Sequence, residues 1–593
     1  MAGVVAVALV VRLWGLTWQL PWQLHPDEGH YTWKAIDLMS QDTLNPKYFR
    51  NPTLLTYLLL GEYRLLGFQP PKADEQAATA DGLLRPPSGV AFVGRLTSAV
   101  MGVLTVLAIG WIGWRMLGPW TGVLGALFLA LAFIHVRDSH YATNDVPSVL
   151  LLTLSVAASL SLLHRPTMRA YLLAGLLGGL ATSTKYSVGL FVVPLVIAHA
   201  IVVWRAWRRP AAALRRWDRD REEERKGPAG RPSGESAGLP TFGPMGPLPH
   251  GMCHMYPPLT KRQNDKSPPR WAGGARALLL PTALAGLVAL VAYVAGTPFT
   301  ILDFPKWRAD FLTQASFVDE GWEGQAKLPP GMAYLLGLGA GIGWVMLVLS
   351  IVGAVLLLRR RPAVGAVLAA FPVAYILFML RSELFFVRFA LPVVPFLCLL
   401  AAIPVVAIVN TLARRRSDLA MPYAAMLAVA AIGQPAFDSV RHNMLIGEDD
   451  TRVLAAQWAL ANVPPGAKMQ VEEYTIRDRR PRAYGGPVWK LDTDLLDVNA
   501  LRRADPTAPL RGSTRYFMVS SFQQDRFSGG PDSPQRQFYE ALAREGRVVA
   551  RFAPGHDGEP IPFDLEDLYS PFWGLDRYER PGPTITVYEL PPR

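Results

Sequence analysis

The sequence predicts a polytopic α-helical membrane protein with a small C-terminal α/β domain. Its 593 residues are 51% hydrophobic and 18% charged, with a mean hydropathy of +0.20, whereas a soluble protein carries about 25% charged residues. Apolar runs long enough to cross a bilayer, about 17–25 residues, occur at about eleven places and stop near residue 437. After residue 438 the composition becomes that of a soluble domain.

The apolar runs define eleven expected transmembrane helices. These spans are 2–20, 89–114, 119–135, 146–163, 170–184, 187–204, 276–296, 332–358, 363–380, 389–411 and 419–437. The run at 4–11 has no small-residue cleavage site after it, so we interpret it as an uncleaved first span and not a signal peptide.

Arginines in the short loops predict the orientation of these spans. If the spans alternate, one side collects Arg115, Arg165, Arg169, Arg205, Arg208, Arg209, Arg359, Arg360, Arg361, Arg414, Arg415 and Arg416. Positive residues concentrate in cytoplasmic loops. We therefore expect the N-terminus inside, and the first loop and the C-terminal domain outside the cytoplasm, in a multi-pass protein of the cell membrane.

The chain is expected to divide into a membrane domain at 1–437 and an extracytoplasmic α/β domain at 438–593. Within the membrane domain, the Arg-, Pro- and Gly-rich stretch 205–275 predicts a disordered cytoplasmic insert. In the first outer loop, 31–39 and 54–60 predict short helices, the second lying at the membrane surface. The later domain is expected to alternate helices and strands, with helices at 451–461 and 537–544 and strands at 468–473, 516–521, 547–552 and 584–590.

Charge and cysteine content exclude two classes of function. The net charge of +12 comes from arginines spread over short loops, so a nucleic-acid partner is not expected. Cys253 lies in a Pro/Gly-rich stretch and Cys398 in an apolar span, which leaves neither a disulfide framework nor a zinc-cysteine site.

Two adjacent carboxylates, Asp27 and Glu28, follow the first span and are flanked by His25, His30 and Tyr31. Charged residues are tolerated at membrane boundaries, so a solvated helix end is one interpretation. The other is catalytic, because a desolvated carboxylate beside a like charge can have the pKa of a general base.

A second polar segment, 135–145, falls on the same predicted side. It contains His135, His140 and Asp145. Asp145 stands at the head of the fourth span, where it is expected either to cap the helix or to join the Asp27 site. Together with His25, these histidines and carboxylates form a candidate set for a divalent metal, which spacing alone does not establish.

Two isolated cations depart from the inside-positive pattern. Lys185 lies between the fifth and sixth spans, and Arg388 precedes the tenth. A lysine there is either a membrane anchor or a phosphate contact. On the side that carries the acidic loops, both cations favour an anionic, lipid-linked substrate.

Five segments together resemble glycosyltransferase family 39, the polytopic GT-C enzymes that include dolichyl-phosphate-mannose protein mannosyltransferases and bacterial relatives that modify lipids. They are HPDE at 25–28, NPTLL at 51–55, RDSHYATND at 137–145, GGLATSTKY at 178–186 and VRFALPVVP at 387–395. The stretch 450–466 is also similar to the outer domain of bacterial members. The loop 297–331 is too short to hold the large lumenal domain of the protein mannosyltransferase branch, which favours a bacterial-type member.

The resemblance implies transfer of a sugar from a polyprenyl-phosphate donor to a protein, lipid or glycan acceptor on the outer face, by one inverting displacement. Asp27 would be the general base, and Glu28 would orient it or help bind a metal. Asp145 matches the second acidic position, and Lys185 and Arg388 would hold the carrier phosphate. His140 belongs to the same expected substrate-binding set. The resemblance names neither the sugar nor the acceptor, and it requires no certain cofactor.

Two other functions were weighed from the residues. A transporter or lipid flippase would place ionisable groups near the bilayer midplane and often shows related halves. The polar clusters here sit at span ends, and no internal repeat is visible. A membrane scaffold would not need the acidic loops.

Overall fold

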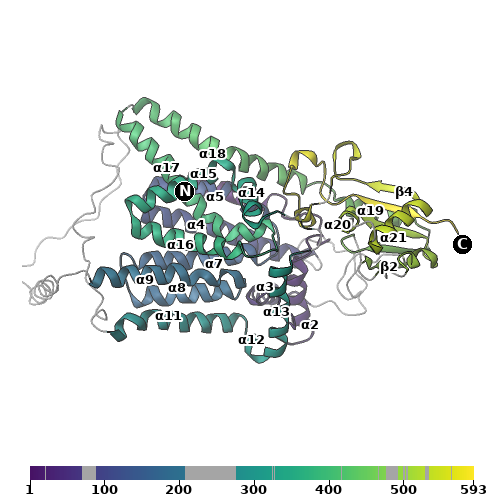
Figure 1. The fold of residues 1–593 in the computed structure, drawn as a ribbon, viewed down its shortest axis with the longest axis horizontal. Helices are drawn as coiled ribbons and strands as arrows, with labels where there is room; N and C mark the ends of the chain where they lie inside the picture. Colours follow the sequence, from purple (N-terminus) through teal and green to yellow (C-terminus); the bar gives the residue numbers. More distant parts are fainter. Residues whose placement is uncertain are drawn as a thin grey trace, which may run out of the picture.

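The computed structural model shows a helical bundle followed by a domain built on one β-sheet, which lies at one end of the bundle (Figure 1). The structure describes residues 1–20, 22–69, 88–207, 275–322, 325, 328–415, 417–464, 466–475, 492–498, 501, 505–527, 533–562 and 564–592. The predicted insert at 205–275 falls almost entirely outside the described residues.

All eleven predicted spans fall on helices, and the protein is a multi-pass membrane protein of mostly helical fold. The helices of the bundle are α1 (Ala2–Leu13), α4 (Ser88–Met116), α5 (Pro119–Leu131), α6 (Phe133–Asp138), α7 (Asp145–Ser161), α8 (Met168–Thr182), α9 (Val192–Trp207), α11 (Ala275–Gly296), α14 (Pro330–Ile342), α15 (Trp344–Arg360), α16 (Pro362–Met379), α17 (Val394–Arg415) and α18 (Ser417–Leu445). Short 3-10 helices precede α9 and α17, namely η2 (Tyr186–Phe191) and η4 (Val387–Val393).

The number of complete crossings stays a prediction. Five helical segments in the described part of the chain are long and apolar enough to span a membrane, and one bent pair raises this to six. That pair covers the single span expected at 332–358, but the chain is bent by 107° between α14 and α15, around Gly343, whose φ is +89°. The first helix is also shorter than expected, since α1 ends at Leu13, just before Gly15 with a φ of +84°.

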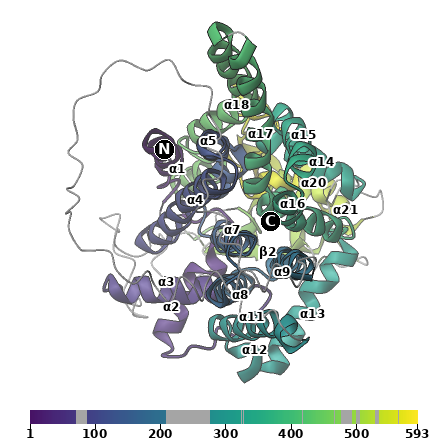
Figure 2. The ribbon, with the colours of Figure 1, turned by 90° about the vertical axis from the view of Figure 1, so that its left-hand side faces the viewer.

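Helix α7 forms the centre of the bundle (Figure 2) and packs against α4, α8, α9 and α16. Its serine and threonine hydroxyls bond to backbone carbonyls, as Thr153 does to Val149 at 2.7 Å. Beside it, α8 packs closely on α11. A Cβ on Gly175 or Gly179 would stand about 2 Å from the carbonyl oxygen of Ala285 (2.1 Å) or Ala289 (2.2 Å), which is the close approach that small residues four apart allow in membranes.

Four short helices gather at the end of the bundle that faces the sheet domain (Figure 1). The two helices predicted at 31–39 and 54–60 are confirmed as α2 (Thr32–Ser40) and α3 (Leu54–Leu65), while the position of the second at the membrane surface stays a prediction. The loop after α11 forms α12 (Phe299–Leu302) and α13 (Phe304–Glu320). Asp310 of α13 accepts a hydrogen bond from the Phe49 N–H at 2.8 Å, which ties the two loops together.

The C-terminal domain is the predicted α/β domain. Its five-stranded sheet has the order β2-β1-β3-β5-β4, parallel on the β2-β1-β3 side and antiparallel for β5. The strands are β1 (Lys468–Glu472), β2 (Asp492–Leu496), β3 (Tyr516–Ser520), β4 (Arg547–Phe552) and β5 (Ile585–Glu589), and the helices are α19 (Thr451–Asn462), α20 (Ser521–Arg526) and α21 (Pro534–Glu545). All four predicted strands are confirmed. Strand β2 was not predicted, because its Asp-Thr-Asp start hides the apolar pattern.

Candidate functional site

Glu28 lies in the 3-10 helix η1 (Glu28–His30) and is fully buried. Its two carboxylate oxygens accept from Arg95 of α4, from Nε at 2.7 Å and Nη2 at 2.9 Å. The Ala142 N–H donates to the same carboxylate at 3.0 Å. Both members of this pair are inaccessible to solvent and the Arg95 Nη1 is bonded to the Trp18 carbonyl at 2.6 Å. Every charged atom of the Glu28–Arg95 pair therefore has a hydrogen-bond partner within the protein.

Asp27, the preceding residue, has a different environment. Its side chain is 27% exposed, and one oxygen, Oδ2, meets the Arg388 Nη2 at 3.1 Å. Behind it, the backbone N–H donates to His25 Nδ1 at 3.2 Å, and the His25 ring stacks on Tyr141 at 4.5 Å between centroids. The carboxylate thus combines one ionic contact with access from outside.

Arg388 lies on η4 inside a group of three aromatic rings. Its Cζ is 3.9 Å from the ring centroid of Tyr569, 4.3 Å from Phe386 and 5.6 Å from Phe389. The second terminal nitrogen, Nη1, is buried and has no hydrogen-bond partner among the described residues. A buried guanidinium nitrogen without an acceptor is costly, and it is the feature expected of a site that receives an anion.

Asp145 and Lys185 form a second ion pair, with Nζ to Oδ1 at 2.5 Å. Asp145 is 4% exposed and Lys185 side-chain exposure is 13%, so the lysine is not a surface anchor. The expectation that Asp145 caps α7 is wrong, because Asn144 holds the N-cap position and Asp145 begins the helix. The Asp145 carboxylate serves the ion pair instead.

The two ion pairs belong to one cluster. Lys185 Nζ lies 5.1 Å from the centroid of the Phe389 ring, which also contacts Arg388. Arg388 interacts electrostatically with both Asp27 and Asp145. From their positions in the sequence, these four residues are predicted to lie on one side of the membrane. The structure brings Asp27, Asp145, Lys185 and Arg388 together.

The three histidines predicted as possible metal ligands, His25, His135 and His140, contact other protein groups. His140 is 1% exposed, and its ring nitrogens lie 2.9 Å from the carbonyl oxygens of Val136 and Trp14. His135 Nδ1 is 2.9 Å from Arg12 Nη2 within the bundle. The geometry therefore gives no support to His140 as a substrate contact. Within the described ranges, no three His, Cys, Asp or Glu side chains converge as metal ligands would.

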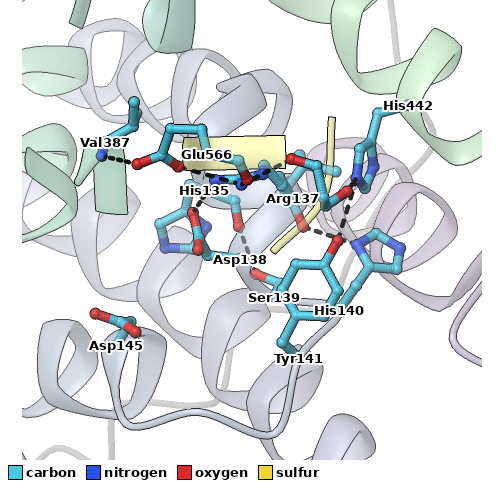
Figure 3. A network of polar contacts seen from close by, with 12 residues as sticks. His135, Arg137, Asp138, Ser139, His140, Tyr141, Asp145, Val387, His442 and Glu566 are labelled. Atoms are coloured by element: carbon cyan, nitrogen blue, oxygen red, sulfur yellow. Dashed lines mark hydrogen bonds and ion pairs between the residues drawn. The ribbon is translucent and has the colours of Figure 1, made fainter. Parts of the chain in front are cut away.

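Four residues of this region were not singled out from the sequence: Arg95, Arg137, Glu566 and Tyr569. Arg137 Nη2 meets Glu566 Oε2 at 3.3 Å and donates to the Ser570 carbonyl at 3.0 Å. Figure 3 shows the Glu566 carboxylate reaching between Arg137 and the Val387 N–H, with Asp145 to one side of this network. Arg137 was within a quoted motif, but nothing in the local sequence indicates its partners in the C-terminal domain.

A narrow hollow adjoins the cluster on the side of the first outer loop. It is lined by His30, Tyr31, Lys34, Pro46, Tyr48, Asn51, Pro52, Thr53 and Thr56. His30 and Tyr48 stack at 5.0 Å. Burial and the negative charge of Asp27 raise the pKa of Tyr48 to about 12. Its hydroxyl is therefore protonated near neutral pH and able to donate a hydrogen bond beside Asp27.

Residues 88–215 match the family model described as dolichyl-phosphate-mannose-protein mannosyltransferase. The predicted family resemblance is confirmed. The matched stretch contains Arg95, Asp145 and Lys185 but neither Asp27 nor Arg388. No curated protein sequence matches the chain.

Solved structures with the same fold come from GT-C enzymes. The oligosaccharyltransferase of Archaeoglobus fulgidus aligns with a TM-score of 0.50 and 11% identity over 95% of this chain and 77% of that protein. ArnT from Cupriavidus metallidurans, in its apo state, aligns with a TM-score of 0.50 and 15% identity over 99% of this chain and 97% of that protein. These likenesses establish the GT-C fold, including the C-terminal domain.

Proposed function

We propose that the protein is a membrane glycosyltransferase that transfers a sugar from a polyprenyl-phosphate donor to an acceptor hydroxyl or amine. The observation that carries the proposal is the buried Nη1 of Arg388, which has no partner in the described part of the chain and lies beside the partly exposed Asp27 carboxylate. The family model supports the donor class, since its description names a dolichyl-phosphate sugar. The GT-C fold supports the reaction class.

Arg388 and Lys185 would hold the donor phosphate. The guanidinium offers Nη1 as a free donor and the aromatic rings exclude water from its faces, which strengthens its attraction for an anion. Lys185 lies near the same Phe389 ring as Arg388. When the sugar leaves, the phosphate gains negative charge, and two fixed cations stabilise this charge better than reorganising water would.

Asp27 would act as the general base. It accepts the proton of the acceptor group as the acceptor atom bonds to the anomeric carbon, and the bond from that carbon to the phosphate oxygen breaks on the opposite side. The configuration at the anomeric carbon is inverted, and the polyprenyl phosphate leaves with the electron pair of the broken bond.

Glu28 would position Asp27 without touching substrate. Its bonds to Arg95 and Ala142 fix η1, and Asp27 is the residue directly before that helix. Asp145 would likewise hold Lys185 in its orientation. This proposal keeps the orienting role predicted for Glu28 and replaces the substrate-binding role predicted for Asp145 with a positioning role.

The orientation follows from the loop arginines. We place the cluster and the domain 438–593 on the extracytoplasmic side, and the 205–275 insert on the cytoplasmic side. A cysteine at Glu448, in the loop between α18 and α19, would test this in intact cells with a membrane-impermeant thiol reagent in a Cys253→Ser, Cys398→Ala background. Labelling only after the cells are opened would contradict the orientation.

The activity is tested with purified full-length protein in vesicles, supplied with radiolabelled polyprenyl-phosphate sugars and membrane extract as acceptor. Wild-type protein should move label to an acceptor fraction, with and without chelator to reveal any metal dependence. Arg388→Ala should lose both transfer and binding of undecaprenyl phosphate. Movement of the labelled lipid between leaflets without sugar transfer would overturn the proposal in favour of a flippase.

A further inference from the structure

We infer that residues 564–578 of the C-terminal domain are a positioning segment for the donor site, in which Tyr569 and Glu566 fix the orientation of Arg388. This inference rests on the proposed function, because it concerns the guanidinium that would receive the carrier phosphate. The C-terminal domain would then take part in donor binding. This role follows neither from the fold nor from the family match, which covers residues 88–215.

Glu566 fixes the backbone from which Arg388 projects. It is 4% exposed, and its Oε1 accepts from the Val387 N–H at 2.5 Å, at the first residue of η4. Its other oxygen meets Arg137 of α6 at 3.3 Å, and its own N–H donates to Asp564 Oδ1 at 2.8 Å. A carboxylate at a helix start bonds the free N–H groups there. Here that carboxylate comes from 179 residues further along the chain.

Tyr569 fixes the guanidinium itself. The ring is 4% exposed, and its centroid is 3.9 Å from Arg388 Cζ. The Phe386 ring is 4.3 Å from the same Cζ and meets the Tyr569 ring at 85°. The guanidinium is therefore confined between aromatic surfaces, with Nη2 on Asp27 and Nη1 unpartnered.

The segment is held against the bundle by contacts separate from the sheet. Ser570 Oγ is 2.7 Å from His442 Nε2 of α18. Tyr578 donates to Asp567 Oδ2 at 2.5 Å, and its carbonyl accepts from Arg441 at 2.5 Å. These bonds fix the position of Tyr569 relative to Arg388. The segment therefore forms part of the donor site and is not a flexible linker.

The expected consequence is a change in donor affinity with little change in turnover. Without the Tyr569 ring the guanidinium gains freedom, which must be lost again when the phosphate binds. A cation–π contact of this kind, desolvated on both sides, corresponds to roughly 10-fold in binding. Asp27 remains in place, so the rate with saturating donor should change much less.

The experiment compares full-length Tyr569→Leu, Tyr569→Phe and Glu566→Gln with Tyr588→Leu, a control in the same domain away from η4. Tyr569→Leu should raise the donor KM and weaken binding of undecaprenyl phosphate by about 10-fold, with kcat changed less than about 3-fold. Tyr569→Phe keeps the ring and loses only the hydroxyl, which interacts with Arg388, so it should weaken binding less than Tyr569→Leu does. Glu566→Gln should weaken binding as well, and it tests the inference even if Tyr569→Leu fails to fold.

Arg388→Ala separates this inference from the proposed function. If Arg388→Ala loses undecaprenyl phosphate while folded Tyr569→Leu and Glu566→Gln both bind it like the Tyr588→Leu control, the positioning inference is overturned and the proposed function stands. If Arg388→Ala itself binds undecaprenyl phosphate like wild type, the proposed phosphate site is wrong, and with it the role of the segment.

Discussion

Asp27 and Glu28 are neighbours in the chain and each pairs with an arginine, but the two pairs differ in completeness. Glu28 and Arg95 are both inaccessible to solvent and share two direct contacts, with further bonds to backbone groups. Asp27 and Arg388 share one contact at 3.1 Å, Asp27 is 27% exposed, and Arg388 Nη1 is unpartnered.

Glu28–Arg95 is therefore a structural pair, and Asp27–Arg388 is a reactive one. A buried pair whose polar atoms are all satisfied offers a ligand nothing, and removal of one partner leaves an uncompensated charge. A pair with a free donor and an exposed oxygen has bonding capacity for substrate. Arg137–Glu566 lies between the two, because both side chains are almost fully buried but Arg137 Nε has no hydrogen-bond partner among the described residues.

The largest effect is expected from breaking the structural pair. Arg95→Ala leaves the Glu28 carboxylate buried without its cation, which costs about 3–5 kcal/mol of folding free energy. The variant should be recovered in low yield and unfold at a lower temperature, as measured by detergent extraction and thermal unfolding. Arg64→Ala, on an exposed part of α3, is the control. A well-folded Arg95→Ala protein would remove the distinction between the two pairs.

Asp27→Asn tests the reactive pair. The amide cannot accept the acceptor proton, so transfer should fall by about 10²–10⁴-fold while the unfolding temperature stays close to that of wild type. Asp37→Asn is a matched control, because Asp37 is 28% exposed, has a cation partner in Lys34 and lies on α2, outside the cluster. Full activity in Asp27→Asn would sink its assignment as the base.

Lys185→Ala should have a smaller effect on the same reaction. Arg388 remains to bind the phosphate, so a loss of roughly 10–100-fold in kcat/KM is expected, measured over a range of donor concentrations. Lys306→Ala removes another lysine that pairs with an aspartate, Asp310, but lies on α13 outside the cluster. Equal losses in both variants would show that the effect of Lys185 is not specific to the site.

The smallest effect on activity is expected from Glu472, a buried carboxylate for which the described residues provide no cationic partner. It accepts from Tyr539 at 2.5 Å and from the Ser520 N–H at 2.7 Å, and burial raises its pKa to about 8. The folded pKa lies above the unfolded value, so the stabilising contribution is present at low pH and is lost as pH rises toward 8.

Thermal unfolding of the full-length protein between pH 5 and 8.5 measures this contribution. The wild-type unfolding temperature of the C-terminal domain should fall with rising pH, and Glu472→Gln should flatten the curve while sugar transfer is retained. Glu540→Gln, an exposed glutamate on α21, is the control. An unchanged slope in Glu472→Gln would contradict the role of burial.

The helices of the bundle and four of the five strands could be predicted from the sequence, because apolar runs and alternating patterns determine local structure. Helices α12, α13 and α20 were not predicted. The chain positions of Asp27, Asp145, Lys185 and Arg388 at span ends were also enough to place them on one side. The break at Gly343 was missed, since an apolar run does not show where a glycine adopts a positive φ.

Pairings between distant residues were decided by the tertiary structure alone. In the sequence, Arg95 is a single charged residue within an apolar span, and nothing marks it as functional. Only the packing of η1 against α4 makes it the partner of Glu28. Glu566 and Tyr569 lie more than 170 residues from Arg388 in the sequence. Charges and rings act through space, so their partners depend on the packing of helices and domains. From the sequence, the four residues of the cluster are predicted to lie at the ends of the spans, whereas the packing of the fold determines which of their polar atoms are left to bind a ligand.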